Sequence, residues 1–211
     1  MTILRFPLVV LMAVLLLMSG VGARADNRYL VTQSTPSDCG PAALATLLRY
    51  YLGVPATEKE MERLTGVTLT NGTTLLGLEK AATAKNCAAD SFRMTYATLQ
   101  QQLETYAAPV IVRVLNPQPH FAVVLEAGEQ YVFLADPAIG NIVLRKSDFL
   151  KRWYIPLDVK PAFAPDEGFV FLAVGPDAEA GRKRRHEMVR RLSQQLEHLK
   201  NARPLASLQR R

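Results

Sequence analysis

The chain reads Gln33-Ser34-Thr35-Pro36-Ser37-Asp38-Cys39-Gly40-Pro41 and continues as Ala42-Ala43-Leu44-Ala45-Thr46-Leu47-Leu48. Proline is tolerated in the first turn of a helix, and alanine and leucine are strong helix formers. Gly53 is a suitable end for this helix, because glycine commonly terminates helices in a left-handed conformation. The run 42–48 contains no charged residue. We therefore predict a buried helix that starts beside Cys39.

Cys39 is the first candidate for a reactive residue. At the N-terminus of a helix, the helix dipole and the unpaired backbone N–H groups favour a thiolate over a thiol, and the thiolate is the nucleophile. Gln33 could donate from its side-chain amide, together with a backbone N–H of the helix start, to an oxyanion on an attacked carbonyl. Gly40 would leave room for the backbone of a substrate. A cysteine at this place could also be a buried structural residue, so the prediction depends on finding a base.

The candidate bases are three histidines, His120, His186 and His198. The last two lie among arginines, and nearby positive charge disfavours a protonated imidazole. His120 begins a run rich in valine, and a hairpin centred on Gly128 would set it directly opposite Asp136. A carboxylate in that place would hold the imidazole in one orientation. The alternatives are a solvent-facing histidine at a strand end and an aspartate that serves only the following turn.

The remaining pattern divides into a helical first half and a strand-rich second half. Thr57 with Glu60 and Thr98 with Gln101 have the spacing of capping boxes, and a further helix is predicted over residues 74–85. Runs rich in Val, Ile and Phe predict strands of one antiparallel sheet at residues 110–115, 120–126, 131–135, 142–145 and 169–174. Helices followed by strands indicate an α+β domain, with N-terminal helices packed on an antiparallel sheet.

Four motifs occur together in a fixed order: Gln33, the string Asp38-Cys39-Gly40-Pro41-Ala42, the strand Pro119-His120-Phe121-Ala122-Val123-Val124 and the loop Ala135-Asp136-Pro137-Ala138-Ile139-Gly140. This combination resembles the C39 family of papain-like cysteine peptidases, over roughly residues 28–175. Members typically form the N-terminal domain of bacteriocin-exporting ABC transporters and cleave leader peptides after a double-glycine motif. The resemblance implies that Cys39 attacks, His120 is the base, Asp136 orients the base and Gln33 serves the oxyanion hole.

The first 25 residues have the features of a secretory signal. Arg5 precedes an apolar run over residues 6–18, and Ala23-Arg24-Ala25 has the small-x-small pattern of a cleavage site. We expect removal after Ala25 and a periplasmic location. An uncleaved membrane anchor is the alternative, although the run is shorter than the ~20 residues that a spanning helix needs.

An exported C39-like chain without transporter segments is similar to the C39-like proteases of bacterial functional amyloid (Fap) secretion systems. This resemblance implies a peptide or protein substrate, such as an amyloid subunit or a secretion component. A C39-like binding or chaperone module would use the same fold with little or no proteolysis, but the presence of Cys39, His120 and Asp136 favours an enzyme. An exported thiol amidase or transpeptidase would use the same three residues.

The positive charge of the chain lies at its C-terminal end. Residues 181–211 hold ten Lys/Arg against two Glu, whereas residues 26–180 hold thirteen Lys/Arg against seventeen Asp/Glu. The basic character is therefore no sign of a nucleic-acid-binding fold. We divide the chain into a signal peptide (1–25), a peptidase domain (26–175) and a basic amphipathic tail (176–211).

The tail shows a narrow apolar stripe. Val189, Leu192, Leu196 and Leu199 have helical spacing, which suits either a helix packed on a partner helix or on the domain, or a solvated basic helix. Such a tail could contact an acidic partner or an anionic membrane surface.

The histidines and cysteines show no metal-ligand spacing, so we expect no metal and no cofactor. Cys87 is predicted to be a small buried apolar residue.

Overall fold

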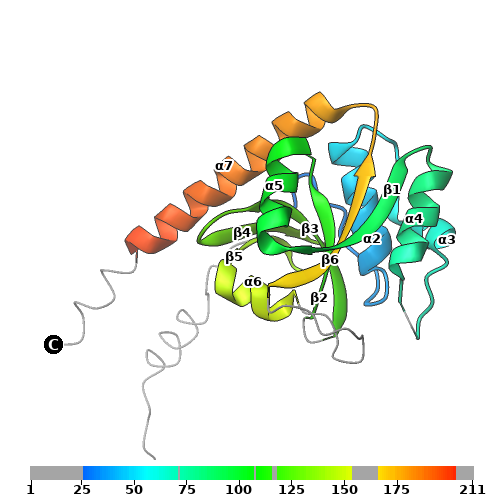
Figure 1. The fold of residues 1–211 in the computed structure, drawn as a ribbon, viewed down its shortest axis with the longest axis horizontal. Coiled ribbons are helices and arrows are strands. Elements are labelled where there is room, and N and C mark those ends of the chain that lie inside the picture. Colours follow the sequence, from blue (N-terminus) through cyan, green and yellow to red (C-terminus); the bar gives the residue numbers. More distant parts are fainter. Residues whose placement is uncertain (1–25, 71, 107, 116–117, 154–165, 203–211) are drawn as a thin grey trace, which may run out of the picture.

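The computed structural model describes residues 26–70, 72–106, 108–115, 118–153 and 166–202. The predicted signal peptide and residues 203–211 of the tail lie outside these ranges. The described strands form one six-stranded sheet in the order β1-β6-β2-β3-β4-β5, in which all neighbours are antiparallel (Figure 1). They are β1 (Ala88–Thr95), β2 (Val110–Leu115), β3 (Pro119–Ala127), β4 (Tyr131–Asp136), β5 (Gly140–Arg145) and β6 (Glu167–Val174).

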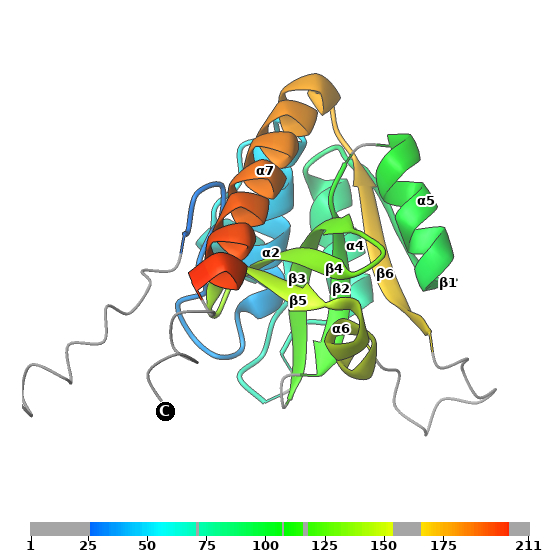
Figure 2. The ribbon, with the colours of Figure 1, turned by 90° about the vertical axis from the view of Figure 1, so that its left-hand side faces the viewer.

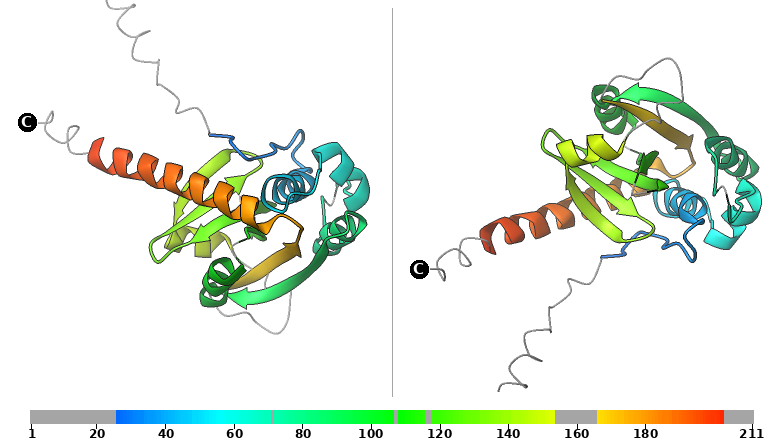
Figure 3. Two further views of the ribbon diagram at one scale, coloured as in Figure 1. Left: turned by 90° about the horizontal axis from the view of Figure 1, so that it is seen from above. Right: turned by 90° about the horizontal axis from the view of Figure 1, so that it is seen from below.

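Helices pack on both faces of this twisted sheet (Figure 3). One face carries α2 (Cys39–Thr46), which continues as the π-helix η1 (Leu47–Tyr51), and α4 (Leu75–Ala84), with α3 (Glu58–Thr65) packed against α2 and α4. The other face carries α5 (Tyr96–Tyr106) and α6 (Lys146–Arg152). The predicted α+β class, with N-terminal helices on an antiparallel sheet, is confirmed.

The helix that starts at Cys39 is buried on all sides, as its sequence predicts. Every residue of α2 is buried, and its alanines let the helix lie close to the sheet. Gly53 follows η1 with a φ of 71°, a conformation that glycine adopts without a steric cost. The helix that begins at Cys39 is therefore part of the interior of the domain.

One of the two predicted helix caps is present and the other is corrected, and the helix predicted from residue 74 has a cap as well. Thr57 accepts from the N–H of Glu60 at 3.2 Å, and Thr74 accepts from the N–H of Gly77 at 3.0 Å. The third helix begins earlier than predicted, because Thr95 rather than Thr98 accepts the capping bond, from the N–H of Thr98 at 3.2 Å. The next residue in the chain, Tyr96, is buried, and this burial places the first turn of α5 before Thr98.

The five predicted strands are present to within two residues at each end. Strand β1 and helix α6 were not predicted. β1 is an edge strand that pairs only with β6 among the described strands, and its sequence Ala-Ala-Asp-Ser-Phe-Arg-Met-Thr lacks a run of apolar residues. An edge strand needs fewer buried side chains than a central strand, so the valine-rich pattern that identifies the other strands is missing here.

A long final helix, α7 (Ala178–Ala202), packs along the domain instead of standing in solvent (Figure 2). It contacts η1, β3 and β5, and its buried residues include Arg185, Met188 and Leu192. Leu199, which belongs to the predicted stripe, is 66% exposed. The stripe therefore serves as a seam only in its first part. Among the helices that the structure describes, none combines the length and the apolar content of a membrane-spanning helix.

Candidate active site

Cys39 is the first residue of α2 and is 6% exposed. Asp38 occupies the N-cap position, but its side chain makes no capping hydrogen bond. The N–H groups of the first turn of a helix have no partner within the helix, and here the N-cap carboxylate does not take them. The helix dipole and these N–H groups thus remain as a source of positive potential beside the thiol.

His120 and Asp136 form a buried pair at one end of β3 and β4. The Nε2 atom of His120 lies 2.8 Å from Oδ1 of Asp136, and the two residues are 8% and 3% exposed. The same Oδ1 accepts from the backbone N–H of Ala138 at 2.9 Å. The carboxylate is therefore held by its own loop, and in turn it fixes the direction of the imidazole.

The pairing of these two side chains was predicted from a register that is wrong. The turn is centred on residues 129 and 130 instead of Gly128, since Ala127 pairs with Val132. A β-bulge between Val124 and Glu126 shifts the register again. Because Val123 pairs with Ala135, the position opposite Asp136 is residue 122 and not residue 120. The side chains of His120 and Asp136 therefore meet along the diagonal between the two strands, a distance that long side chains can span.

The imidazole of His120 also interacts with Cys39. Burial disfavours the charged ring, but the hydrogen bonds to Asp136 and Cys39, together with their negative charges, outweigh burial and raise the pKa of His120 to about 9. Because Nε2 faces Asp136, the ring nitrogen left for Cys39 is Nδ1. The structure thus brings the three predicted residues Cys39, His120 and Asp136 together around one imidazole.

Gln33 lies on the segment that leads into Cys39. Its backbone N–H donates to the carbonyl of Pro137 at 3.0 Å, so this segment is attached to the loop that follows Asp136. Its side-chain Nε2 donates to the carbonyl of Thr35 at 2.8 Å, while its Oε1 is buried without a hydrogen-bond partner. An amide nitrogen has two hydrogens, so one N–H of Gln33 is left for another acceptor.

Gly40 has a different role from the predicted one. A Cβ atom placed on Gly40 would lie 2.7 Å from Cβ of Thr73. The space beside this glycine is therefore taken by Thr73 and is not left for a substrate backbone.

The two cysteines form no disulfide, and Cys87 is buried as predicted. Burial raises the pKa of the Cys87 thiol, which makes this second thiol a poor nucleophile.

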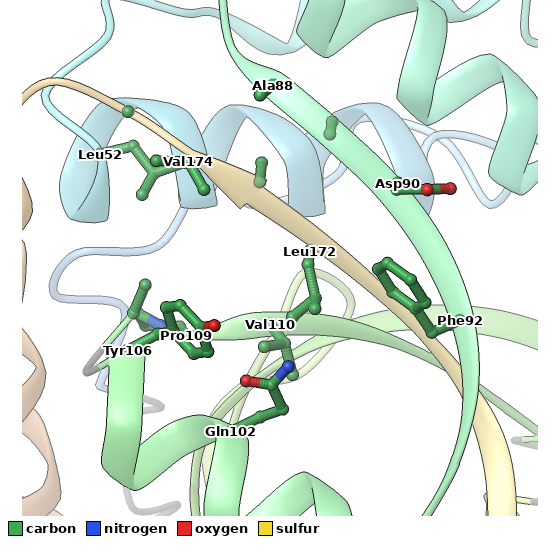
Figure 4. A pocket seen from close by; sticks show the side chains of 14 residues that line it. Leu52, Ala88, Asp90, Phe92, Gln102, Tyr106, Pro109, Val110, Leu172 and Val174 are labelled. Atoms are coloured by element: carbon green, nitrogen blue, oxygen red, sulfur yellow. The ribbon is translucent and has the colours of Figure 1, made fainter.

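A separate apolar pocket of about 600 Å³ lies between α5 and the strands β1 and β6 (Figure 4). Its lining includes Leu52, Phe92, Tyr106, Leu172 and Val174. The lining contains none of the three residues around the imidazole. This pocket is mostly apolar, and Asp90, Gln102 and Tyr106 contribute its polar side chains.

A buried helix with a cysteine at its N-terminus, packed on an antiparallel sheet that carries a histidine–aspartate pair, defines the class of papain-like cysteine peptidase domains. The sequence profile of the Peptidase C39 family matches residues 27–162 of this chain. The chain therefore belongs to the Peptidase C39 family.

Known relatives and solved structures agree with this assignment. The chain is 39% identical over 125 residues to an uncharacterized protein of Methanothermobacter marburgensis, a match that covers 59% of this chain and 82% of that protein. It is 28% identical over 161 residues to the probable functional amyloid protease FapD of Pseudomonas aeruginosa, covering 72% and 63% respectively. Its fold is similar to that of a double glycine motif protease from an AMS/PCAT transporter in complex with the leader peptide, with a TM-score of 0.56 and 21% identity over 73% of this chain and 96% of that chain.

Proposed function

We propose that the protein is an exported cysteine peptidase that cleaves a peptide bond in a secreted protein or in a component of a secretion system. The observation that carries the proposal is the buried His120, which interacts with Asp136 on one side and with Cys39 on the other. This arrangement is that of an activated nucleophile, its base and the residue that orients the base.

The reaction follows from the protonation of His120. With a pKa near 9, the imidazole is protonated at neutral pH, and an adjacent imidazolium favours the thiolate form of a cysteine. The sulfur of Cys39 adds to the carbonyl carbon, and the oxyanion receives hydrogen bonds from the amide of Gln33 and the N–H groups of the helix start. His120 then gives its proton to the leaving amine, the C–N bond breaks and a thioester remains on Cys39.

The thioester is released by water. Neutral His120 takes a proton from the water molecule as its oxygen attacks the thioester carbon, and the C–S bond breaks to give the carboxylic acid product. The enzyme returns to the imidazolium and thiolate pair. Asp136 keeps the imidazole in one orientation throughout, and no step needs a metal or a cofactor.

The substrate class rests on the relatives and on the sequence. FapD is named as a probable functional amyloid protease, and the solved double glycine motif protease holds a leader peptide. Residues 1–25 have the pattern of a secretory signal. Together they support a periplasmic enzyme whose substrate is a segment of an exported protein, such as an amyloid subunit, with cleavage after a double glycine or in a linker.

The proposal can be tested by mass spectrometry of peptide ends in the exported proteome of cells with wild-type protein and with Cys39→Ala. We expect one or a few protein ends to disappear in the variant, and the sequence before the lost ends will identify the cleavage motif. The same spectra will show whether the mature chain starts at Asp26. Identical sets of ends in the two strains, together with secretion that depends on the protein, would favour the binding or chaperone module instead.

A further inference from the structure

The loop that leads into Cys39 is held by the carboxylate of Asp38. At the N-cap of a helix, an aspartate ordinarily accepts from N–H groups of the first turn, but Asp38 makes no such bond. Its Oδ2 accepts instead from the backbone N–H of Thr35 at 3.1 Å and from the hydroxyl of Thr35 at 2.6 Å. Asp38 is 6% exposed. A buried carboxylate thus turns away from the helix that it precedes and binds the preceding loop.

Thr35 connects Asp38 to Gln33. The carbonyl oxygen of Thr35 accepts from the N–H of Asp38 at 3.1 Å and from Nε2 of Gln33 at 2.8 Å. This contact determines which end of the amide is nitrogen, because Oε1 in the same place would face another oxygen. The orientation of the Gln33 amide therefore depends on the position of Thr35, and Asp38 fixes that position through three hydrogen bonds.

We propose that Asp38 is a positioning residue for the oxyanion hole. It fixes Thr35, which aims the amide of Gln33, and by turning away from α2 it leaves the first-turn N–H groups free of an N-cap carboxylate. An aspartate that capped the helix would occupy these donors and would place negative charge where the oxyanion forms. The inference rests on the proposed function, since it assigns Asp38 to the reaction of Cys39 and Gln33.

Two other carboxylates lie beside Asp38, and one of them, Glu62, provides a matched control for the loss of its charge. Oxygen atoms of Asp38, Glu58 and Glu62 lie within 4.8 Å of one another. Glu58 accepts from the N–H and the hydroxyl of Ser34, both at 2.5 Å, so it helps to hold the same loop. The charge removed by Glu62→Ala is the same as that removed by Asp38→Ala, but the contacts between Asp38 and Thr35 stay in place. Glu62→Ala is therefore the control for a change of local charge alone.

The first experiment compares two reactions of the same thiol. Turnover is measured with a fluorogenic peptide amide that ends in Gly-Gly, and the reactivity of Cys39 is measured with iodoacetamide, which is attacked at a saturated carbon and forms no oxyanion. For Asp38→Ala we expect kcat to fall about 10-fold to 100-fold with little change in KM, since a misplaced hydrogen-bond donor to the oxyanion lowers the rate of the chemical step by about this factor. The alkylation rate should stay within about twofold of the wild type, because the attack on iodoacetamide forms no oxyanion and does not use the oxyanion hole.

Two companion variants separate positioning from folding. Asp38→Asn keeps an acceptor oxygen for Thr35, so it should recover most of the kcat that Asp38→Ala loses. Glu62→Ala should behave as the wild type. In the background of Gln33→Ala, the further loss caused by Asp38→Ala should be small, since both changes act through the same amide.

A second readout needs no substrate. The side-chain amide signals of Gln33 in an NMR spectrum can be assigned by their absence from Gln33→Ala. They should move in Asp38→Ala and stay in place in Glu62→Ala. Unmoved signals, an equal loss of turnover and alkylation, or additive effects of Asp38→Ala and Gln33→Ala would overturn the inference. Turnover that survives Cys39→Ala would contradict the proposed function, while the NMR comparison would still decide the position of Gln33.

Discussion

His120 lies between a carboxylate and a thiol, and its protonation sets the pH range in which the site can work. The hydrogen bond and the charge of Asp136 are among the causes that raise the pKa of His120 above its ordinary value of 6.5, against the effect of burial. A raised pKa keeps the imidazolium present at neutral pH and loses it as the pH passes about 9. The activity should therefore have its alkaline limit near that pH.

The first prediction follows from removing the charge of Asp136. In Asp136→Asn, burial still disfavours the imidazolium but the carboxylate no longer supports it, so the alkaline limit of kcat/KM should move to lower pH. Activity at pH 7 should fall by at least about a hundredfold, as expected when a histidine loses its orienting carboxylate. The measurement is the pH profile of kcat/KM with the fluorogenic Gly-Gly peptide amide. Glu129→Gln, at a side chain that is 82% exposed, is the control, and an unmoved alkaline limit in Asp136→Asn would contradict the assignment.

At this scale the sequence predicts residue types better than contacts. His120 is the one histidine of the sequence outside the basic tail, so it could be chosen from the sequence alone. The bulge between Val124 and Glu126 leaves no signal in the continuous apolar run over residues 121–125, and this is why the register was wrong. The contact of Asp38 with Thr35 was missed because an aspartate before a helix normally indicates a cap.

At the scale of secondary-structure elements, the last helix, α7, packs on the end of the helix that begins at Cys39. Arg184 donates from Nη1 to the carbonyl of Tyr50 at 2.8 Å, and the N–H of Asp177 donates to the carbonyl of Leu52 at 3.2 Å. A Cβ on Gly181 would lie 1.9 Å from the carbonyl oxygen of Tyr51, so only glycine allows this approach. The start of α7 thus covers the end of the helix that begins with Cys39, and it satisfies carbonyl groups there.

The second prediction concerns Arg185, the buried arginine of α7. Its guanidinium donates to the carbonyls of Leu125 and Leu103 at 2.5 and 2.7 Å, and Arg185→Ala would leave both acceptors buried without these donors. We expect the free energy of unfolding to fall by about 2–4 kcal/mol, measured by urea denaturation. Arg190→Ala, at an exposed position of the same helix, should change it by less than about 0.5 kcal/mol. A loss of unfolding free energy for Arg185→Ala that is as small as the loss for Arg190→Ala would contradict a stabilising role for the buried arginine of α7.

The sequence gives only part of this arrangement of elements. The stripe of Val189 and Leu192 predicts a helix, but the preceding run of basic residues is typical of a solvated face. The burial of Arg185 depends on carbonyls in β3 and α5 that are distant in the sequence. Edge strand β1 was missed for a related reason, because its pairing with β6 and not its own pattern defines it.

At the scale of the whole molecule, charge is divided between residues 26–180, which have an excess of Asp and Glu, and the basic end at residues 181–211. Arg182, Lys183 and Arg190 are exposed on α7, whereas Arg185 faces the interior. The exposed cations can attract an anionic surface or an acidic partner, and this attraction weakens as salt screens it. The basic end thus combines a buried structural face with a charged outer face.

The third prediction tests that outer face. A variant in which Arg182, Lys183 and Arg190 are all replaced by Gln should cleave the short Gly-Gly peptide amide at the wild-type rate, because these side chains are exposed and are not among the groups that act on His120. Binding of the wild type to vesicles that contain anionic phospholipids should weaken with added NaCl, and the variant should bind more weakly at low salt. Equal binding of the two proteins at low salt, or binding of the wild type that does not depend on salt, would contradict a role for this face.

The α+β class and the family can be predicted from the sequence at this scale, because helical patterns followed by strand patterns indicate the class and four motifs in a fixed order indicate the family. The natural substrate cannot be predicted in this way. It depends on which segment of another protein fits around Cys39, and the sequence of the enzyme contains that information only through the shape of the folded site.

The most direct test of the central claim is to trap the acyl group on the enzyme. Wild-type protein is mixed with an excess of an ester of a Gly-Gly peptide, quenched with acid while the intermediate is present, digested and mapped by mass spectrometry. A nucleophilic Cys39 should carry the peptide acyl group as a thioester, and Cys39→Ala should carry none and should release no product. An acyl group on a residue other than Cys39, or product release by Cys39→Ala at the wild-type rate, would contradict the account.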